Sequence, residues 1–165
     1  MSMCKRSLGL AFALSLVLAA TLQAASSSAP LQVSAEVAPN CQIAISNLAF
    51  GKYDPMAQNA GAELDAAAEV TMLCTRSSRA SVNIDFGRNG VGASRSLAGA
   101  TQHVTYQLYH DKGRTQQWGG AGDGLQFVSQ GIHKPEELTL YGRIPPGQEV
   151  ASGVYTDVVT ATVDF

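Results

Sequence analysis

The last residues of the chain, Val154 to Phe165, read VYTDVVTATVDF and indicate the fold class. In an extended strand, side chains at every second position point to the same face. One face of this segment is apolar except for an aspartate and carries Tyr155, Asp157, Val159, Ala161, Val163 and Phe165. β-branched residues dominate and no Gly or Pro interrupts them, so the segment predicts a core strand. The sequence stops within this predicted strand, and we expect its backbone to need a pairing partner.

Length and composition favour one domain. The chain has 165 residues, of which 45% are hydrophobic and 15% are charged. This is enough for one domain with its own core and too little for two. We see no internal repeat and no domain boundary after residue 30.

The first residues, 1–25, predict a secretory signal. Lys5 and Arg6 precede an uncharged apolar run from Leu8 to Leu22, and small residues follow at 24–26. The run, about 15 residues long, is short for a membrane span. We therefore expect an exported chain that loses Cys4 with its signal. Removing Lys5 and Arg6 leaves 9 basic against 13 acidic residues, a formal charge of −4. That balance argues against nucleic acid or an anionic membrane surface as a partner.

Two cysteines remain after the signal, Cys41 and Cys74. In an exported protein an even pair is expected to form a disulfide. Closing a loop of this length stabilises the fold by roughly 3–4 kcal/mol in chain-entropy terms. The alternative is a pair of free, buried thiols.

The rest of the chain reads as short strands separated by turns. A small polar linker at 26–30 precedes alternating apolar residues at Leu31, Val33, Ala35 and Val37, and the alternation resumes after Pro39 at 41–45. Further strands are expected at 70–74, 82–86, 104–108 and 138–144, whereas the alanine-rich stretch 57–69 is expected to be a surface loop. Turns are expected at 50–55, at Asn89–Gly90 as a hairpin, at 111–113 and, as a type II turn, at 145–148, and a flexible loop is expected at 119–124. This pattern predicts an all-β sandwich, with a linker and a first strand at 26–38 and the sandwich domain at 39–165.

The sequence contains no recognisable catalytic motif, so we expect no enzyme, no cofactor and no metal site. It lacks the nucleophile-elbow, zinc-protease, phosphate-loop and Cys-x-x-Cys patterns. The histidines, His103, His110 and His133, are scattered, and the first two are expected on opposite strand faces. Asp85, Asp111 and Asp123 lie beside turn glycines, where capping of backbone amides is favoured over calcium binding. Trp118 fits either stacking on a sugar or packing at the sandwich edge.

Four stretches taken together resemble a known family. They are Phe50–Pro55 (FGKYDP), Val70–Cys74 (VTMLC), Ser94–Leu97 (SRSL) leading to Tyr106–Asp111 (YQLYHD) and Trp118–Gly119, and Tyr141–Gln148 (YGRIPPGQ) leading to Gly153–Asp157 (GVYTD). In this order they are similar to the spore coat protein U domain, a family that includes pilins of archaic chaperone–usher pili. The resemblance runs from about Leu31 to Phe165.

The resemblance implies an immunoglobulin-like sandwich that lacks its last strand and is completed by donor-strand complementation. In such pilins a periplasmic chaperone lends a strand, and an outer-membrane usher exchanges it for the amino-terminal strand of the next subunit. We refer to residues 31–37 as the donor segment, with Leu31, Val33, Ala35 and Val37 as the candidate donor side chains. The acceptor groove is expected along Tyr155, Val159, Ala161, Val163 and Phe165. The alternative is that the donor segment folds back on its own domain.

Three functions compete. The first is a structural subunit of a surface fibre, with a pilus chaperone, an usher and copies of itself as partners, serving attachment and biofilm formation. The second is a single-domain adhesin whose loops around Tyr53 or Trp118 bind a sugar or an abiotic surface. The third is a coat protein that assembles without a fibre. An enzyme is a distant fourth.

Overall fold

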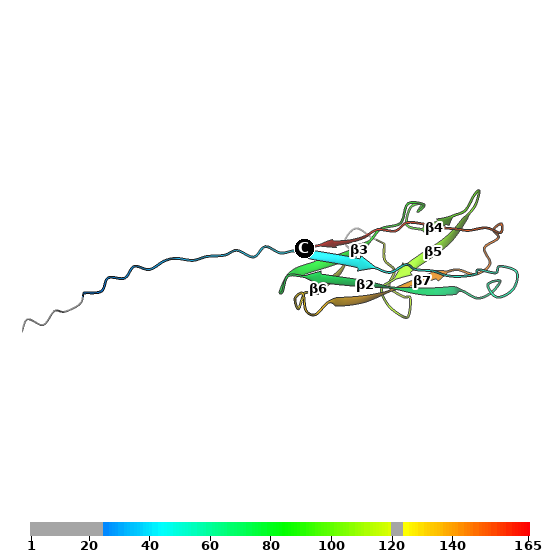
Figure 1. Cartoon of the computed structure of the whole chain (residues 1–165). Coiled ribbons are helices and arrows are strands. Elements are labelled where there is room, and N and C mark those ends of the chain that lie inside the picture. Colours follow the sequence, from blue (N-terminus) through cyan, green and yellow to red (C-terminus); the bar gives the residue numbers. More distant parts are fainter. Residues whose placement is uncertain (1–24, 120–123) are drawn as a thin grey trace, which may run out of the picture. The chain divides into compact units, whose positions relative to one another are not determined.

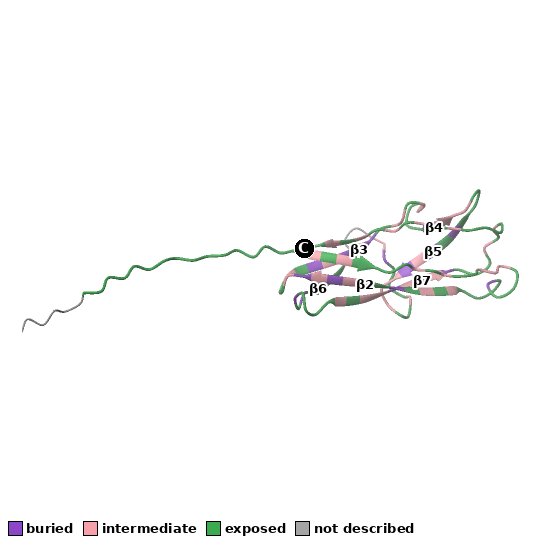
Figure 2. Cartoon of the chain, viewed as in Figure 1, coloured by how far each residue is buried: buried purple, intermediate pink, exposed green. Residues whose placement is uncertain are grey.

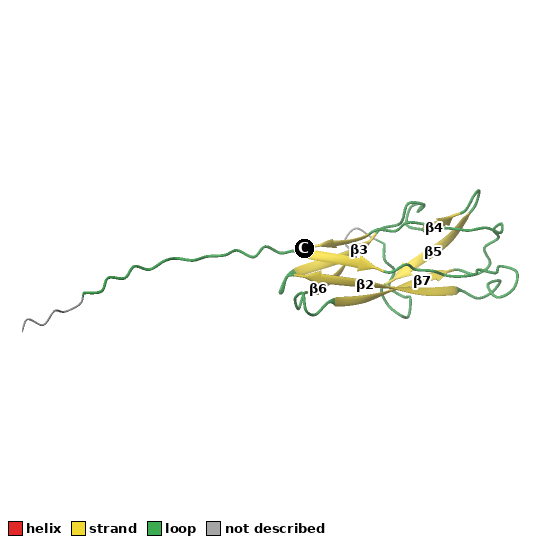
Figure 3. Cartoon of the chain, in the orientation of Figure 1, coloured by secondary structure: helices red, strands yellow, loops and turns green. Residues whose placement is uncertain are grey.

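The described residues form strands, turns and loops without a helix (Figure 3). The structure is a computed structural model that describes residues 25–119 and 124–165. The expected signal peptide and most of the glycine loop at 119–124 lie outside these residues. By their contacts, residues Glu36–Phe165 form one compact unit, and residues 25–35 belong to a separate one that has no regular structure in its described part.

Two antiparallel sheets make up the compact unit (Figure 1). The larger sheet has five strands in the order β1-β2-β7-β5-β4, and the smaller has three in the order β6-β3-β8. The strands are β1 (Cys41–Ile45), β2 (Leu64–Cys74), β3 (Arg79–Ile84), β4 (Arg95–Ala98), β5 (His103–Tyr109), β6 (Leu125–Val128), β7 (Glu136–Ile144) and β8 (Ala161–Asp164). This arrangement confirms the predicted all-β sandwich.

The core lies between the sheets and is built by alternation. Along β2, and along β7 from Thr139 onward, more buried and more exposed residues alternate (Figure 2). The buried members include Val70 and Met72 on β2 and Leu140 and Ile144 on β7, and they pack with Val82 and Ile84 of β3. A period of two is what a sheet with one buried face requires.

The stretch 64–69 corrects a prediction. We expected a surface loop over 57–69, but β2 begins at Leu64 and pairs with β7 from the Leu64–Ile144 register onward. The loop prediction is right only for residues 57–63, which lie before the strand. Alanine has low strand propensity, so this half of β2 gave a weak local signal. Its strand geometry comes from pairing with β7.

Asn89–Gly90 is a turn, but the predicted hairpin is wrong. The strands before and after it, β3 and β4, belong to different sheets, so the turn is part of a crossing between layers. The Asn89 side chain donates to the Thr156 carbonyl and to Asp157 Oδ1, at 3.1 and 3.0 Å. A local turn signal cannot distinguish a hairpin from such a crossing.

The disulfide is confirmed between Cys41 and Cys74. These residues face each other at one end of the β1–β2 ladder, with their Cα atoms 4.0 Å apart. The bond ties the first strand of the compact unit to the longest strand of the larger sheet.

Candidate functional site

The carboxyl-terminal segment passes from one sheet to the other. Thr156 forms an isolated bridge with Ala98 of β4, with N–O distances of 3.0 and 2.8 Å, whereas Ala161–Asp164 pairs with β3 in the smaller sheet. The prediction of one strand over 154–165 is therefore wrong in extent, because a segment that changes sheets cannot keep one continuous ladder. The predicted faces hold as far as Val163, since every second residue from Tyr155 onward is half-buried and its neighbours are exposed.

An open groove lies beside this segment. It has a volume of about 1090 Å³ and is lined on one side by residues 45–56 and on the other by residues 150–159. Its floor consists of core side chains from β4, β5 and β7: Leu97, Val104, Tyr106, Leu108, Leu140 and Ile144. The groove is thus an opening through which the apolar interior of the sandwich can be reached.

The edge strands of the two sheets explain where the groove opens. β1 is one edge strand of the larger sheet, and β8 is one edge strand of the smaller sheet. The two strands approach each other near the carboxyl terminus of the chain (Figure 1). The groove walls after Ile45 and before Ala161 are not regular strands. Within the described residues, no strand closes the gap between the two sheets there. Unpaired edges of this kind are sites for strand addition.

The five predicted groove residues divide into two groups. Tyr155 and Val159 line the groove. Ala161 and Val163 instead belong to β8, opposite β3, and Phe165 is 56% exposed. The structure does not bring these three to the groove, because the chain has by then entered the smaller sheet.

The opposite wall was missing from the sequence-based prediction. Leu48 and Phe50 pack directly on the backbone of Gly142 in β7, where a Cβ would lie 3.0 Å from Leu48 Cδ1 and 2.8 Å from Phe50 Cζ. The Phe50 ring also meets Tyr106 edge to face, with the centroids 5.9 Å apart. The apolar alternation of Leu48 and Phe50 was the available signal, but Phe50 was interpreted only as the start of the turn at 50–55 and Leu48 was given no role.

Asp157 is the one charged residue on the inner face of the segment, and its carboxylate is fully used. Oδ2 accepts the Tyr106 hydroxyl at 2.8 Å, and Oδ1 accepts the backbone amides of Asn89 and Val158 at 3.1 and 2.8 Å. Burial, reinforced by the hydrogen bond to Asp157, raises the pKa of the Tyr106 hydroxyl well above its usual value. Tyr106 therefore remains a protonated donor, and the polar group at the groove wall is satisfied.

Tyr53 holds the turn at the mouth of the groove. Its hydroxyl donates to the Pro145 carbonyl at 3.0 Å and accepts the Gln148 amide at 2.9 Å. It thereby bridges the two ends of the predicted turn at 145–148, in which Gly147 has a φ of +69° as type II geometry requires. The half-buried Tyr53 has a structural role in this turn, which weakens its assignment to surface binding.

Trp118 is not a surface residue, and its predicted role in surface binding is wrong. Its side chain is 1% exposed and packs edge to face with His110, with the centroids 5.3 Å apart. The fully buried Arg95 donates to the carbonyl oxygens of Trp118, Ile84 and Asp85, at 2.7, 3.1 and 2.9 Å. The glycines after Trp118 suggested an exposed loop, whereas its backbone amide is bonded to Leu108 O in the core.

The donor segment has no pairing partner within the described residues. Residues 25–40 form no strand, and Leu31, Val33 and Val37 are 85%, 83% and 78% exposed. Ala35 is exposed as well. The predicted strand is therefore absent here, although an alternating apolar face persists in the sequence. A strand needs a neighbour for its backbone groups, and the sequence pattern of this segment cannot supply one by itself.

Other candidate residues fall into structural roles. Asp85 and Asp111 accept backbone amides, from Gly87 and Thr160 and from Thr115 and Gln116, as predicted for turn caps. Asp123 lies outside the described residues. Over the described ranges no group of three His, Cys, Asp or Glu residues is placed to hold a metal ion. In the same residues no helix has the length and apolar character to cross a membrane.

Comparisons with known proteins agree with this geometry. The chain is 34% identical over 168 residues to Protein U of Myxococcus xanthus, covering 93% of each protein. Its fold is similar to a chain of the CsuC–CsuE chaperone–tip adhesion subunit pre-assembly complex from the archaic chaperone-usher Csu pili of Acinetobacter baumannii. That match has a TM-score of 0.57 and 18% identity, and it covers 78% of this chain and 40% of the other. At this identity the likeness concerns the immunoglobulin-like fold alone. Because residues 27–162 match the Spore Coat Protein U domain, the chain belongs to that family.

Proposed function

We propose that this chain is a structural subunit of a secreted surface fibre in which each copy donates residues 31–37 to the groove of the next. The observation that carries the proposal is the coexistence of an open apolar groove and an exposed alternating apolar segment in one chain. The groove lacks a strand along its open edges, and the exposed segment lacks a surface against which to bury its apolar side chains. An added strand would satisfy the open edges and place alternate side chains against the core residues on the floor.

The free energy of inserting the donor segment comes from side-chain burial and from backbone hydrogen bonds, and a stable fibre needs both. Burying Leu31, Val33, Ala35 and Val37 would contribute about 5–8 kcal/mol, at ~1.5–3 kcal/mol for each large side chain. Hydrogen bonds along both groove walls would add to this and slow dissociation. A head-to-tail contact of this kind does not close on itself, so it propagates into a filament.

Export and partners complete the proposal. The pattern of Lys5, Arg6 and the apolar run at 8–22 supports export. A groove left open during transit would be an aggregation hazard, which favours a periplasmic chaperone that covers it and an outer-membrane usher that exchanges the chaperone for a donor segment. The similar fold in a chaperone–subunit complex of Csu pili supports the same partners. Attachment and biofilm formation are the roles we assign to the finished fibre on the cell surface.

A coat protein that assembles without a fibre is the second candidate. The observation favouring it is the identity with Protein U and the family to which both belong. A coat protein of this kind would use its groove within one molecule or not at all.

The test is an unboiled SDS gel of mature protein exported together with its chaperone. We expect a ladder of detergent-resistant multimers that disappears when residues 31–37 are deleted. Val33→Asp should shorten the ladder, because it places a charge in the groove. The matched control, Ser34→Asp, adds the same charge to the opposite face of the segment and should leave the ladder intact. A stable monomer in every lane would favour the coat protein.

A further inference from the structure

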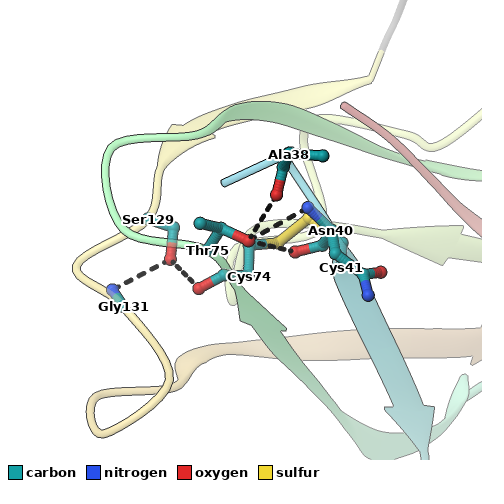
Figure 4. The surroundings of a disulfide bond; sticks show 7 residues. All are labelled: Ala38, Asn40, Cys41, Cys74, Thr75, Ser129 and Gly131. Atoms are coloured by element: carbon teal, nitrogen blue, oxygen red, sulfur yellow. Dashed lines mark hydrogen bonds between the residues drawn. A yellow bond between two sulfur atoms is a disulfide. The ribbon is translucent and has the colours of Figure 1, made fainter. Parts of the chain in front are cut away.

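Residues 38–40, which we call the base of the donor segment, are held by Thr75, next to the disulfide. Pairing between β1 and β2 continues one residue beyond Cys41–Cys74, because the Thr75 amide donates to the Asn40 carbonyl at 2.8 Å (Figure 4). The Asn40 amide in turn donates to Thr75 Oγ1 at 3.0 Å. The hydroxyl of Thr75 lies 3.3 Å from the Asn40 oxygen and 3.5 Å from the Ala38 oxygen, so one side chain contacts the backbone of two residues at this base.

These bonds keep residues 38–40 in line with β1. Asn40 is fixed on β2 beside a covalent link between the two strands. Pro39 has a restricted φ, and the residue before a proline favours extended geometry. Each of the three residues is therefore biased toward continuing the direction of the strand past the end of the sheet.

A donor segment that returned to its own groove would have to reverse at these same residues. The groove walls begin at Ile45, at the other end of β1. Folding back along β1 would require a hairpin, and hairpin turns need two to five residues. Only residues 38–40 separate Val37 from β1. Because these three residues would have to form the turn, reversing the chain would break their bonds to Thr75.

We infer that Thr75 keeps the donor segment from folding onto its own domain and so directs it to a second copy of this chain. Thr75 is a positioning residue that never enters the groove. The inference rests on the proposed function, since it concerns which groove the donor segment fills. It gives the disulfide a further role, because Cys41–Cys74 holds Thr75 next to Asn40.

Replacing the hydroxyl tests the inference in the full mature chain. Thr75→Val keeps the β-branched shape and the backbone bond to Asn40 but removes the bonds that the hydroxyl makes to Asn40 and Ala38, whereas Thr75→Ser keeps a hydroxyl. The net value of one hydrogen bond corresponds to about a 2- to 10-fold change in an equilibrium. We expect Thr75→Val to raise the ratio of closed monomer to multimer by that factor and Thr75→Ser to leave it unchanged. A closed monomer is recognised by a protease-protected donor segment and a population independent of protein concentration.

An insertion provides a second test that leaves Thr75 and its bonds intact. Gly-Ser-Gly placed between Ala38 and Pro39 supplies turn residues that Thr75 does not hold, and we expect the closed monomer to increase. The matched control places the same insertion between Ser27 and Ser28, ahead of the donor segment, and should have no effect. If wild-type protein forms multimers and neither Thr75→Val nor the insertion changes the ratio, the inference is wrong while the fibre proposal stands. If wild-type protein forms no multimers, the fibre proposal itself fails.

Discussion

Tyr53 shows how one hydroxyl can replace the hydrogen bond that a turn lacks. The ends of the turn at 145–148 are joined through its hydroxyl, which donates to the Pro145 carbonyl and accepts the Gln148 amide. Tyr53→Phe leaves both groups without this partner, so we expect the free energy of unfolding to fall by about 1–2 kcal/mol. Urea denaturation provides the measurement. Tyr109→Phe is the control, since its hydroxyl has no hydrogen-bond partner in the described part of the chain; equal losses in the two variants would contradict the role of Tyr53.

Arg95 joins the two sheets from inside the core. Burial lowers the pKa of its guanidinium, but the group stays charged and satisfies the carbonyls of Ile84, Asp85 and Trp118. Arg95→Leu removes the partner of three carbonyl oxygens, of which the bonds to Ile84 and Trp118 are buried, and we expect the free energy of unfolding to fall by about 3 kcal/mol or more. Arg95→Lys should cause most of the same loss in stability, because an ammonium cannot place donors at three carbonyls as the planar guanidinium does. Thermal unfolding checks both variants, and Arg88→Lys at an exposed position should change stability by less than about 0.5 kcal/mol.

The carboxyl-terminal segment depends on Asp85 where it enters the smaller sheet. Partial burial opposes ionisation, but backbone amides of Thr160 and Gly87 and the nearby Arg95 outweigh it and hold the pKa of Asp85 below its usual value. A carboxyl whose pKa is depressed on folding stabilises the protein above about pH 4, and that contribution is lost as the pH falls through the folded-state value.

Asp85→Asn should therefore destabilise the domain at pH 7 and matter progressively less as the pH is lowered from about 4 toward 2. Comparing the unfolding free energies of wild type and variant across that range isolates this carboxyl from Asp65, whose pKa is lowered by hydrogen bonding to Arg143. A difference between the two proteins that stays constant with pH would contradict the assignment.

Strand alternation made most of the fold predictable from the sequence. The segments at 41–45, 70–74, 104–108 and 138–144 are strands as expected, because their apolar residues alternate and their buried face is continuous. Residues 64–69 were missed, since alanine does not distinguish a strand from a loop without its partner. Asn89–Gly90 was misinterpreted because nothing local to a turn specifies which sheet the next strand joins.

The groove was predictable only in part. Alternation in the last twelve residues gave Tyr155 and Val159, but the move of this segment between sheets and the wall at Leu48 and Phe50 depend on contacts between distant parts of the chain. Trp118 was misplaced for the same reason. Its neighbours in the sequence are small and flexible, whereas its neighbours in space are core side chains.

At the scale of the whole molecule, the sandwich lacks one strand and the chain carries an exposed segment of matching character. The groove and the donor segment are joined through β1, whose first residue is linked to β2 by the disulfide. In the fibre that we propose, the short joint at residues 38–40 determines which subunit the donor segment contacts. This organisation accounts for a domain whose edge is open and whose preceding residues 25–40 form no strand.

The most direct test is to find which groove the donor segment occupies. A photo-crosslinking phenylalanine analogue replaces Leu31, and ¹⁴N- and ¹⁵N-labelled protein are assembled together before irradiation and mass spectrometry. The account predicts crosslinks between peptides of different isotopic label, joining position 31 to residues of the groove walls at 45–56 or 150–159. Crosslinks confined to peptides of the same label would place the segment in its own domain and contradict the fibre.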